Sequence, residues 1–187
     1  MEIERLYKKI VELRENNSDK FQVLSKHIQS MPEDMFEYIL KRLEKQIEIV
    51  KKYGIEIRPA IDPFVSSELG IYRRLDDLEL GELLDYPKCC VESFSETARY
   101  GIDSEHLKEI ENMEFDENTY AIILPSGFIP CSINCKKAIA NKLIGKIDKE
   151  TYDKLLKLEE ELFIELPHYH GAYDEYFEKI IVKNKKG

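Results

Sequence analysis

The feature that most constrains this sequence is the placement of its cysteines. All four lie in two short stretches of the 187-residue chain. Cys89 and Cys90 are adjacent in YPKCC and form the first cysteine pair, and Cys131 and Cys135 of PCSINC form the second cysteine pair. Chance seldom gathers every thiol of a chain into two such pairs. We therefore expect the fold to bring these two distant segments to a common point.

Both cysteine pairs are predicted to lie at helix starts. Pro87 favours a helix whose first turn holds the first cysteine pair, because a proline is tolerated where the first amide has no intrahelical partner. Cys131 or Ser132 would begin a second helix. Helix N-termini present unpaired N–H groups and the positive end of the helix dipole, which lowers the pKa of a thiol and favours the thiolate. The sequence therefore predicts that four thiolates meet in a region of positive electrostatic potential.

An iron–sulfur cluster is the cofactor that this spacing favours. Four thiolates are the usual ligand set of such a cluster, and its irons are separate ligand positions, so adjacent cysteines can reach different irons. We expect a [4Fe–4S] cluster held by Cys89, Cys90, Cys131 and Cys135. Such a protein would act in electron or sulfur transfer, for example in the thiolation of tRNA or of a cofactor.

Other chemistries remain open. Zinc is usually tetrahedral, with cysteine ligands spaced C-x(2–4)-C, which the second cysteine pair matches and the adjacent first pair fits poorly. A zinc site would make the chain a zinc-stabilised module for protein interaction. Without a metal, Cys131 or Cys135 would act in a thiol-based sulfur transferase, and plain buried cysteines are the last alternative. The sequence has no glycine-rich phosphate loop, Walker lysine or GxSxG elbow, so it assigns no catalytic residue.

Further polar residues are candidates for a substrate site or for support of the metal ligands. They are Ser126, Gly127, Ser132, Arg99, His168 and His170. The glycine would let the backbone approach a cofactor closely, but an ordinary strand-to-helix turn uses glycine as well. The arginine could hold an anionic substrate. The two loop histidines could bind metal or move a proton, or their loop could pack on the core. His27 and His106 are expected to be surface or satisfied histidines.

Apolar periodicity predicts a mainly α fold with a small β component, in the α+β class. Apolar residues recur at helical spacing through the first 53 residues, where a third helix would open at Pro32 and end at Gly54. We expect residues 1–54 to form a helical hairpin or bundle and residues 55–187 to form a core domain that carries the cysteine motifs. The two parts could also form one continuous domain.

The second half of the chain carries the best predicted strand. TYAIILP, residues 119–125, is rich in β-branched and apolar residues. The helix that the second cysteine pair begins is expected to bury Ile139 and Leu143. Residues 148–163 are predicted to form a helix capped by its first residue, an aspartate, and a last helix is predicted over about 173–182.

The negative net charge indicates which class of partner the protein binds. The formal net charge is −9 and the pI is about 5.1, whereas general nucleic-acid binders are usually basic. We therefore expect a protein or small molecule as partner and no general nucleic-acid binding. No apolar run approaches membrane-spanning length, and the charged start MEIERLYKKI is not a secretory signal. These features predict a cytoplasmic protein without a membrane segment, where clustered cysteines favour metal or redox chemistry.

In their wider context, the two cysteine stretches resemble the signature of an archaeal family. YPKCCVESF followed by GFIPCSINCKKA is similar to the pattern of a domain of unknown function, number four-eight-three. The resemblance covers roughly residues 80–145. Its matching positions are Tyr86, Pro87, Cys89, Cys90, Phe94, Pro130, Cys131, Ser132 and Cys135. It implies an archaeal, methanogen-like source and supplies no reaction, so the metal expectation rests on the cysteine spacing.

Overall fold

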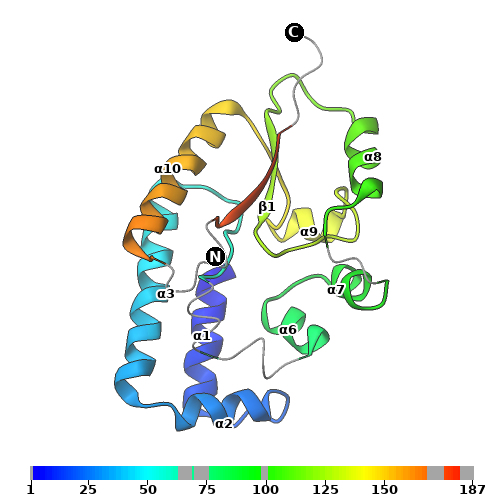
Figure 1. Cartoon of the computed structure of the whole chain (residues 1–187). Helices are drawn as coiled ribbons and strands as arrows, with labels where there is room; N and C mark the ends of the chain where they lie inside the picture. The colour runs from blue at the N-terminus through cyan, green and yellow to red at the C-terminus, as the bar shows by residue number, and fades with distance from the viewer. Residues whose placement is uncertain (1, 63–68, 70–75, 98–100, 168–174, 182–187) are drawn as a thin grey trace.

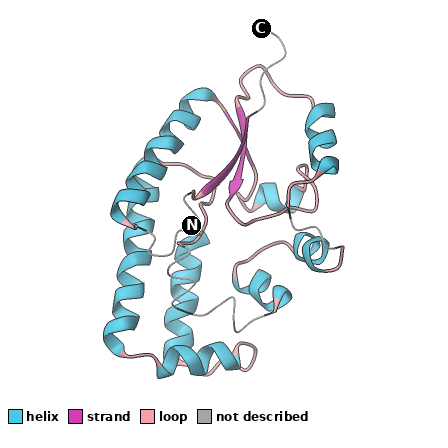
Figure 2. Ribbon diagram, viewed as in Figure 1, coloured by secondary structure: helices cyan, strands magenta, loops and turns pink. Residues whose placement is uncertain are grey.

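Helices dominate the chain, and a small sheet lies among them (Figures 1 and 2). The computed structural model describes residues 2–62, 69, 76–97, 101–167 and 175–181. Its elements are α1 (Glu2–Glu15), α2 (Gln22–Ser30), α3 (Glu33–Tyr53), α6 (Asp77–Leu83), α7 (Lys88–Ser95), α8 (Ser104–Asn112), β1 (Ala121–Pro125), α9 (Lys136–Ala140), β2 (Gly145–Ile147), α10 (Lys149–Glu165) and β3 (Phe177–Ile181). The predicted class, mainly α with a small β component, is confirmed.

The N-terminal helices form the predicted bundle. Helix α1 buries the apolar residues that recur along one face, Ile3, Leu6, Ile10 and Leu13. Helix α3 begins after Pro32 and ends at Gly54, whose φ of 64° lies in the left-handed region that glycine adopts at little cost. Helices α1 and α3 lie side by side, and α2 joins them at one end (Figure 1).

The sheet is antiparallel and has the order β2-β1-β3. Strand β1 is central, and its Ala121 lies opposite Ile147 of β2 and Ile181 of β3. All five residues of β1 are buried, as expected of a strand covered on both faces. The long helices α3 and α10 lie on one side of the sheet, and the short helices α7 to α9 lie on the other (Figure 1).

Strand β1 separates two hydrophobic cores. Ala121 and Ile123 belong to the larger cluster, which includes residues of α1, α3 and α10. Ile122 and Leu124 belong to a second cluster, which contains the buried Cys90 and Cys135, and Cys89 and Cys131 pack against it. This division follows from the strand itself, since successive side chains point to opposite faces of a sheet. The cysteines thus lie on one face of β1 and the N-terminal helices on the other.

The predicted C-terminal helix over about 173–182 is wrong where the structure describes it. Residues Phe177–Ile181 form β3 and pair with the whole length of β1. Glu159 of α10 fixes the start of this strand, since one of its carboxylate oxygens accepts from the amides of Tyr176 (2.9 Å) and Phe177 (3.0 Å). Pairing with a buried strand outweighed a local helical pattern of only a few residues.

The segment after the second cysteine pair also differs from the prediction. Helix α9 spans only Lys136–Ala140, so it does not begin at Cys131 or Ser132. Ile139 is 40% exposed rather than buried, whereas Leu143 is buried as predicted. The chain then forms β2, which the sequence did not indicate, before α10 begins with Asp148 accepting from the Thr151 amide as its cap. In the described part of the chain, no helix has both the length and the apolar character that crossing a membrane requires.

Candidate metal centre

The first cysteine pair lies in the first turn of α7, as predicted. Pro87 is the residue before the helix, and the Cys90 amide donates to its carbonyl oxygen at 2.8 Å. Cys90 is only 1% exposed, and Cys89 is half-buried. Successive residues of a helix point about 100° apart, so one thiol faces the core and the other lies nearer the surface.

The second cysteine pair lies in a turn-rich segment between β1 and α9. After β1 the chain turns at Gly127, whose φ is 80°. Ser132 shapes the next turn, because its hydroxyl accepts from the Asn134 amide (3.0 Å) and its carbonyl accepts from the Cys135 amide (3.0 Å). Cys135 then stands at the N-cap of α9. Cys131 therefore lies outside any helix, contrary to the prediction.

Helix α8 holds this segment in place through two side chains. His106 is fully buried, and its Nε2 lies 2.8 Å from the Pro130 carbonyl oxygen. One carboxylate oxygen of Glu109 accepts from the Ser132 hydroxyl (3.0 Å) and from the Ile133 amide (2.8 Å). His106 is thus a satisfied histidine, as expected. Glu109 was missed because a glutamate on a short, charged helix gives no signal of a distant backbone partner.

The four sulfurs meet, which confirms the convergence predicted from the sequence. The Sγ atoms of Cys89 and Cys135 are 3.8 Å apart, those of Cys90 and Cys131 are 3.8 Å apart, and those of Cys90 and Cys135 are 3.7 Å apart. All four sulfurs lie within 4.8 Å of one another. Four thiols this close are a ligand set for a metal, so the chain has a candidate metal centre.

Burial changes the acidity of the metal-free thiols in a way the sequence did not predict. Burial strongly raises the pKa of Cys90, and burial also raises the pKa of Cys131 to about 11. The pKa of Cys135 is lowered: burial opposes this, but a hydrogen bond from the Ala138 amide and the neighbouring thiols outweigh it. The expectation that helix starts lower the pKa of all four thiols is therefore wrong. Desolvation of the charged form exceeds the effect of the helix dipole.

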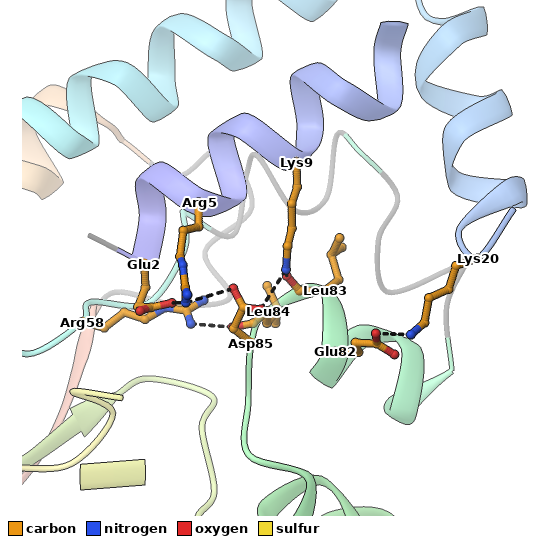
Figure 3. Close-up of polar contacts among 9 residues, drawn as sticks. All are labelled: Glu2, Arg5, Lys9, Lys20, Arg58, Glu82, Leu83, Leu84 and Asp85. Atoms are coloured by element: carbon orange, nitrogen blue, oxygen red, sulfur yellow. Dashed lines mark hydrogen bonds and ion pairs between the residues drawn. The ribbon is translucent and has the colours of Figure 1, made fainter. Parts of the chain in front are cut away.

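The turn that leads into α7 is fastened to the N-terminal helices. Lys9 of α1 donates to the Leu83 carbonyl (3.1 Å) and pairs with the Asp85 carboxylate (2.9 Å), as Figure 3 shows. Arg58 donates to the carbonyl of Leu84 at 2.5 Å (Figure 3). Asp85 itself has a φ of 55°, a left-handed conformation that is uncommon outside glycine. These contacts hold residues 83–85, the segment that precedes the first cysteine pair, in place.

The remaining candidates divide between the surroundings of the centre and undescribed parts of the chain. Ser126 and Gly127 line a cavity together with Cys90. Ser132 shapes the turn of the second cysteine pair through its bond with Glu109. Three further candidates lie outside the described residues, namely Arg99, His168 and His170.

Comparison with known proteins identifies the family of these motifs. The model of the family described as Protein of unknown function (DUF483) matches residues 43–163, a range that contains both cysteine pairs. The chain belongs to this family. The DUF483 match extends beyond the segment of roughly 80–145 that the motifs alone indicated, and it includes the second half of α3 and nearly all of α10.

Two relatives match the DUF483 chain over nearly its whole length. An uncharacterized protein of Methanocaldococcus jannaschii is 54% identical over 183 residues, which cover 96% of this chain and 99% of the relative. An uncharacterized protein of Methanothermobacter thermautotrophicus is 47% identical over 181 residues, which cover 97% of this chain and 98% of the relative. No solved structure matches the chain. The relatives are archaeal, in agreement with the resemblance, and their descriptions state no reaction.

Proposed function

We propose that this DUF483 protein binds a single zinc ion through its four cysteines. The observation that carries the proposal is the spacing of the sulfurs. A tetrahedral ion with metal–sulfur bonds of about 2.3 Å holds its sulfurs about 3.8 Å apart. Three of the sulfur–sulfur distances are 3.7 or 3.8 Å. The adjacent first cysteine pair, whose spacing seemed poor for one ion, thus presents both sulfurs at suitable distances from Cys135.

The role of this ion is structural. Four cysteine ligands complete a tetrahedral zinc site and leave no position for a substrate, unlike catalytic zinc sites, which keep one open. The ion would join α7 to the turn before α9, two segments that otherwise meet through the second hydrophobic cluster. Metal binding would therefore add to the folding free energy of this side of the sheet. The protein would be a zinc-stabilised module whose partner recognises the surface around this centre.

Metal analysis of anaerobically purified full-length protein tests this proposal. We expect a colourless protein with about one equivalent of zinc and little iron. Cys90→Ser and Cys135→Ser should each lose most of the zinc, because each removes a buried ligand. Ser93→Ala, in the same helix as Cys90, should keep it, since the Ser93 hydroxyl lies 3.5 Å from the hydroxyl of Thr97, just beyond the end of α7, and is no metal ligand. Wild-type zinc content in both cysteine variants would disprove the ligand assignment.

A [4Fe–4S] cluster is the second candidate. The chemistry of four thiolates supports it, and the half-buried state of Cys89 and Cys131 would give electrons or sulfur a path to the surface. Against it, a cluster spreads its four ligands over separate irons, which needs wider sulfur separations than a single ion. A brown protein with iron and sulfide and a broad absorption near about 400 nm would favour the cluster and a role in electron or sulfur transfer. A metal-free protein whose thiols cycle with reductant would favour a thiol-based sulfur transferase.

A further inference from the structure

A cavity of about 240 Å³ lies directly beside the metal centre. Its walls come from four parts of the chain: residues 60–61, α6 with Leu80, α7 with Val91 and Phe94, and the turn after β1 with Phe128. Cys90 belongs to both the cavity wall and the sulfur group. The same two segments that supply the metal ligands therefore enclose a space that the metal does not occupy.

The shape of this cavity is built into the packing of α6 against α7. A Cβ atom added at Gly81 would lie 2.4 Å from a Val91 methyl carbon, so only glycine permits the observed approach of the two helices. The rings of Tyr86 and Phe128, which both line the cavity, lie 4.9 Å apart at a tilt of 58°. At the turn, Gly127 adds no side chain, and a Cβ there would meet no atom within 4 Å. Gly81 thus allows α6 to approach α7 closely, and Gly127 leaves the space at the turn open.

The lining has the chemistry of a small-molecule site. Most of its residues are aliphatic or aromatic, and a few polar groups are placed among them, which is the usual composition of ligand pockets. The polar members are Asp77, Tyr86, Cys90 and Ser126. Asp77 carries the negative charge in this set, and no described lining residue carries a positive charge. The whole chain adds a net charge of −9, which attracts cations to its clefts.

We propose that this cavity binds a small organic cation with an apolar body. The apolar part would contact Leu80, Phe94 and Phe128, and the ammonium group would face the Asp77 carboxylate near the solvent. An apolar cavity of about 150 Å³ holds benzene, so 240 Å³ is room for roughly ten non-hydrogen atoms. Aromatic walls add to the attraction, because ring faces favour cations. An anionic ligand of the same shape would meet the same carboxylate without a compensating charge.

The inference goes beyond the metal site, since the ligand contacts the apolar walls whichever metal the sulfurs hold. An NMR titration of ¹⁵N-labelled full-length protein, in its metal-loaded form, tests it with 2-phenylethylamine as the probe. We expect saturable shifts confined to amides around the cavity and a dissociation constant of about 1 mM or below, in line with a ligand of this size. The carboxylate analogue 3-phenylpropionate should bind at least about fivefold more weakly. Equal binding of the two probes, or no saturable shift with the amine, would overturn the proposal.

Three variants on α6 locate the site. Leu80→Trp fills the cavity and should lower the affinity for the amine more than about tenfold, because the apolar body loses its place. Leu78→Trp is the matched control, since Leu78 is 51% exposed and does not line the cavity, and it should bind as wild type does. Asp77→Asn should weaken the amine by roughly two- to fivefold and leave 3-phenylpropionate unchanged or improved. Unaltered amine binding in Leu80→Trp would place the ligand elsewhere.

Zinc content measured on every sample separates this inference from the metal proposal. Loss of amine binding with unchanged zinc in Leu80→Trp supports the cavity as the site. Amine binding by a wild-type protein that holds iron, or no metal, would contradict the zinc proposal and leave the cavity assignment standing. A wild-type protein that holds one zinc ion and does not bind the amine would support the zinc proposal and contradict the cavity assignment.

Discussion

His106 of α8 donates its Nε2–H to the carbonyl oxygen of Pro130 at 2.8 Å, and Pro130 directly precedes Cys131. A carbonyl can only accept, so the proton lies on Nε2. The other ring nitrogen, Nδ1, accepts from the Asp103 amide at 3.2 Å. Both ring nitrogens of a fully buried histidine are thereby satisfied. The ring links the start of α8 to the backbone that presents the second cysteine pair.

Removing the His106 ring should destabilise the side of the sheet that carries the four cysteines. We expect His106→Ala to lower the free energy of unfolding by about 2–4 kcal/mol, because it leaves the Pro130 carbonyl without its partner and opens a cavity. Chemical denaturation of the metal-loaded protein measures this change. His27→Ala is the control, since His27 is half-buried on α2, and it should change stability by less than about 1 kcal/mol. Equal losses in the two variants would contradict a special role for His106.

Glu109 should control how firmly the metal is held. We expect Glu109→Ala to lower metal affinity by about tenfold, because residues that orient the ligand segment commonly contribute at this level. A competition titration with a chromophoric chelator measures the affinity. Glu111→Ala changes an exposed glutamate of the same helix and should leave the affinity as in wild type. A small effect of both substitutions would show that the turn holds its shape without α8.

Asp85 offers a test of the strained turn before the first cysteine pair. Its φ of 55° suits asparagine and aspartate better than alanine. We therefore expect Asp85→Ala to cost about 1–2 kcal/mol in addition to the partly buried ion pair with Lys9, and Asp85→Asn to cost about 1 kcal/mol or less, since it loses only that pair. Thermal unfolding of the two variants gives the difference. The prediction fails if alanine and asparagine lower Tm equally.

Gly81 should respond to substitution in the opposite sense from an ordinary helical glycine. Alanine at an exposed helical glycine stabilises by about 1 kcal/mol. Gly81→Ala should instead destabilise by about 1–3 kcal/mol, because its Cβ would lie 2.4 Å from a Val91 methyl carbon. Trimming that methyl should restore part of the loss, so Gly81→Ala with Val91→Ala should be less destabilised than the sum of the two single variants. Additive losses would show that α6 and α7 separate freely.

The sequence predicted the features that depend on local signals. The N-terminal helices, Gly54 as a helix end, the Asp148 cap and the convergence of two cysteine pairs all follow from residue spacing or from residue chemistry. Each is decided within a few residues or by an unusual composition. The local prediction went wrong for β3, where five residues gain their structure by pairing with β1, and for the start of α9, where Ser132 forms a turn instead.

The supports of the candidate site could not be read from the sequence for a different reason. His106 and Glu109 act on backbone groups more than twenty positions away, and nothing in their own neighbourhood indicates those partners. The acidity of Cys90 depends on burial by residues from several elements, and that burial reverses the effect expected from its helix start. The cavity requires the close approach of α6 to α7. Gly81 permits this approach, but a glycine in the sequence does not by itself predict it.

Strand β1 contributes alternate side chains to two separate apolar interiors, and this arrangement has a consequence for metal starvation. If the four cysteines hold the proposed ion, removing it would take a cross-link from one interior only, while α1, α3 and α10 would keep their own packing against Ala121 and Ile123. The metal-free protein would therefore be only partly ordered. The N-terminal helices and α10 would stay folded, and the side that carries the cysteines would be less stable. Loss of the proposed ion would therefore yield a partly folded state instead of a fully denatured chain.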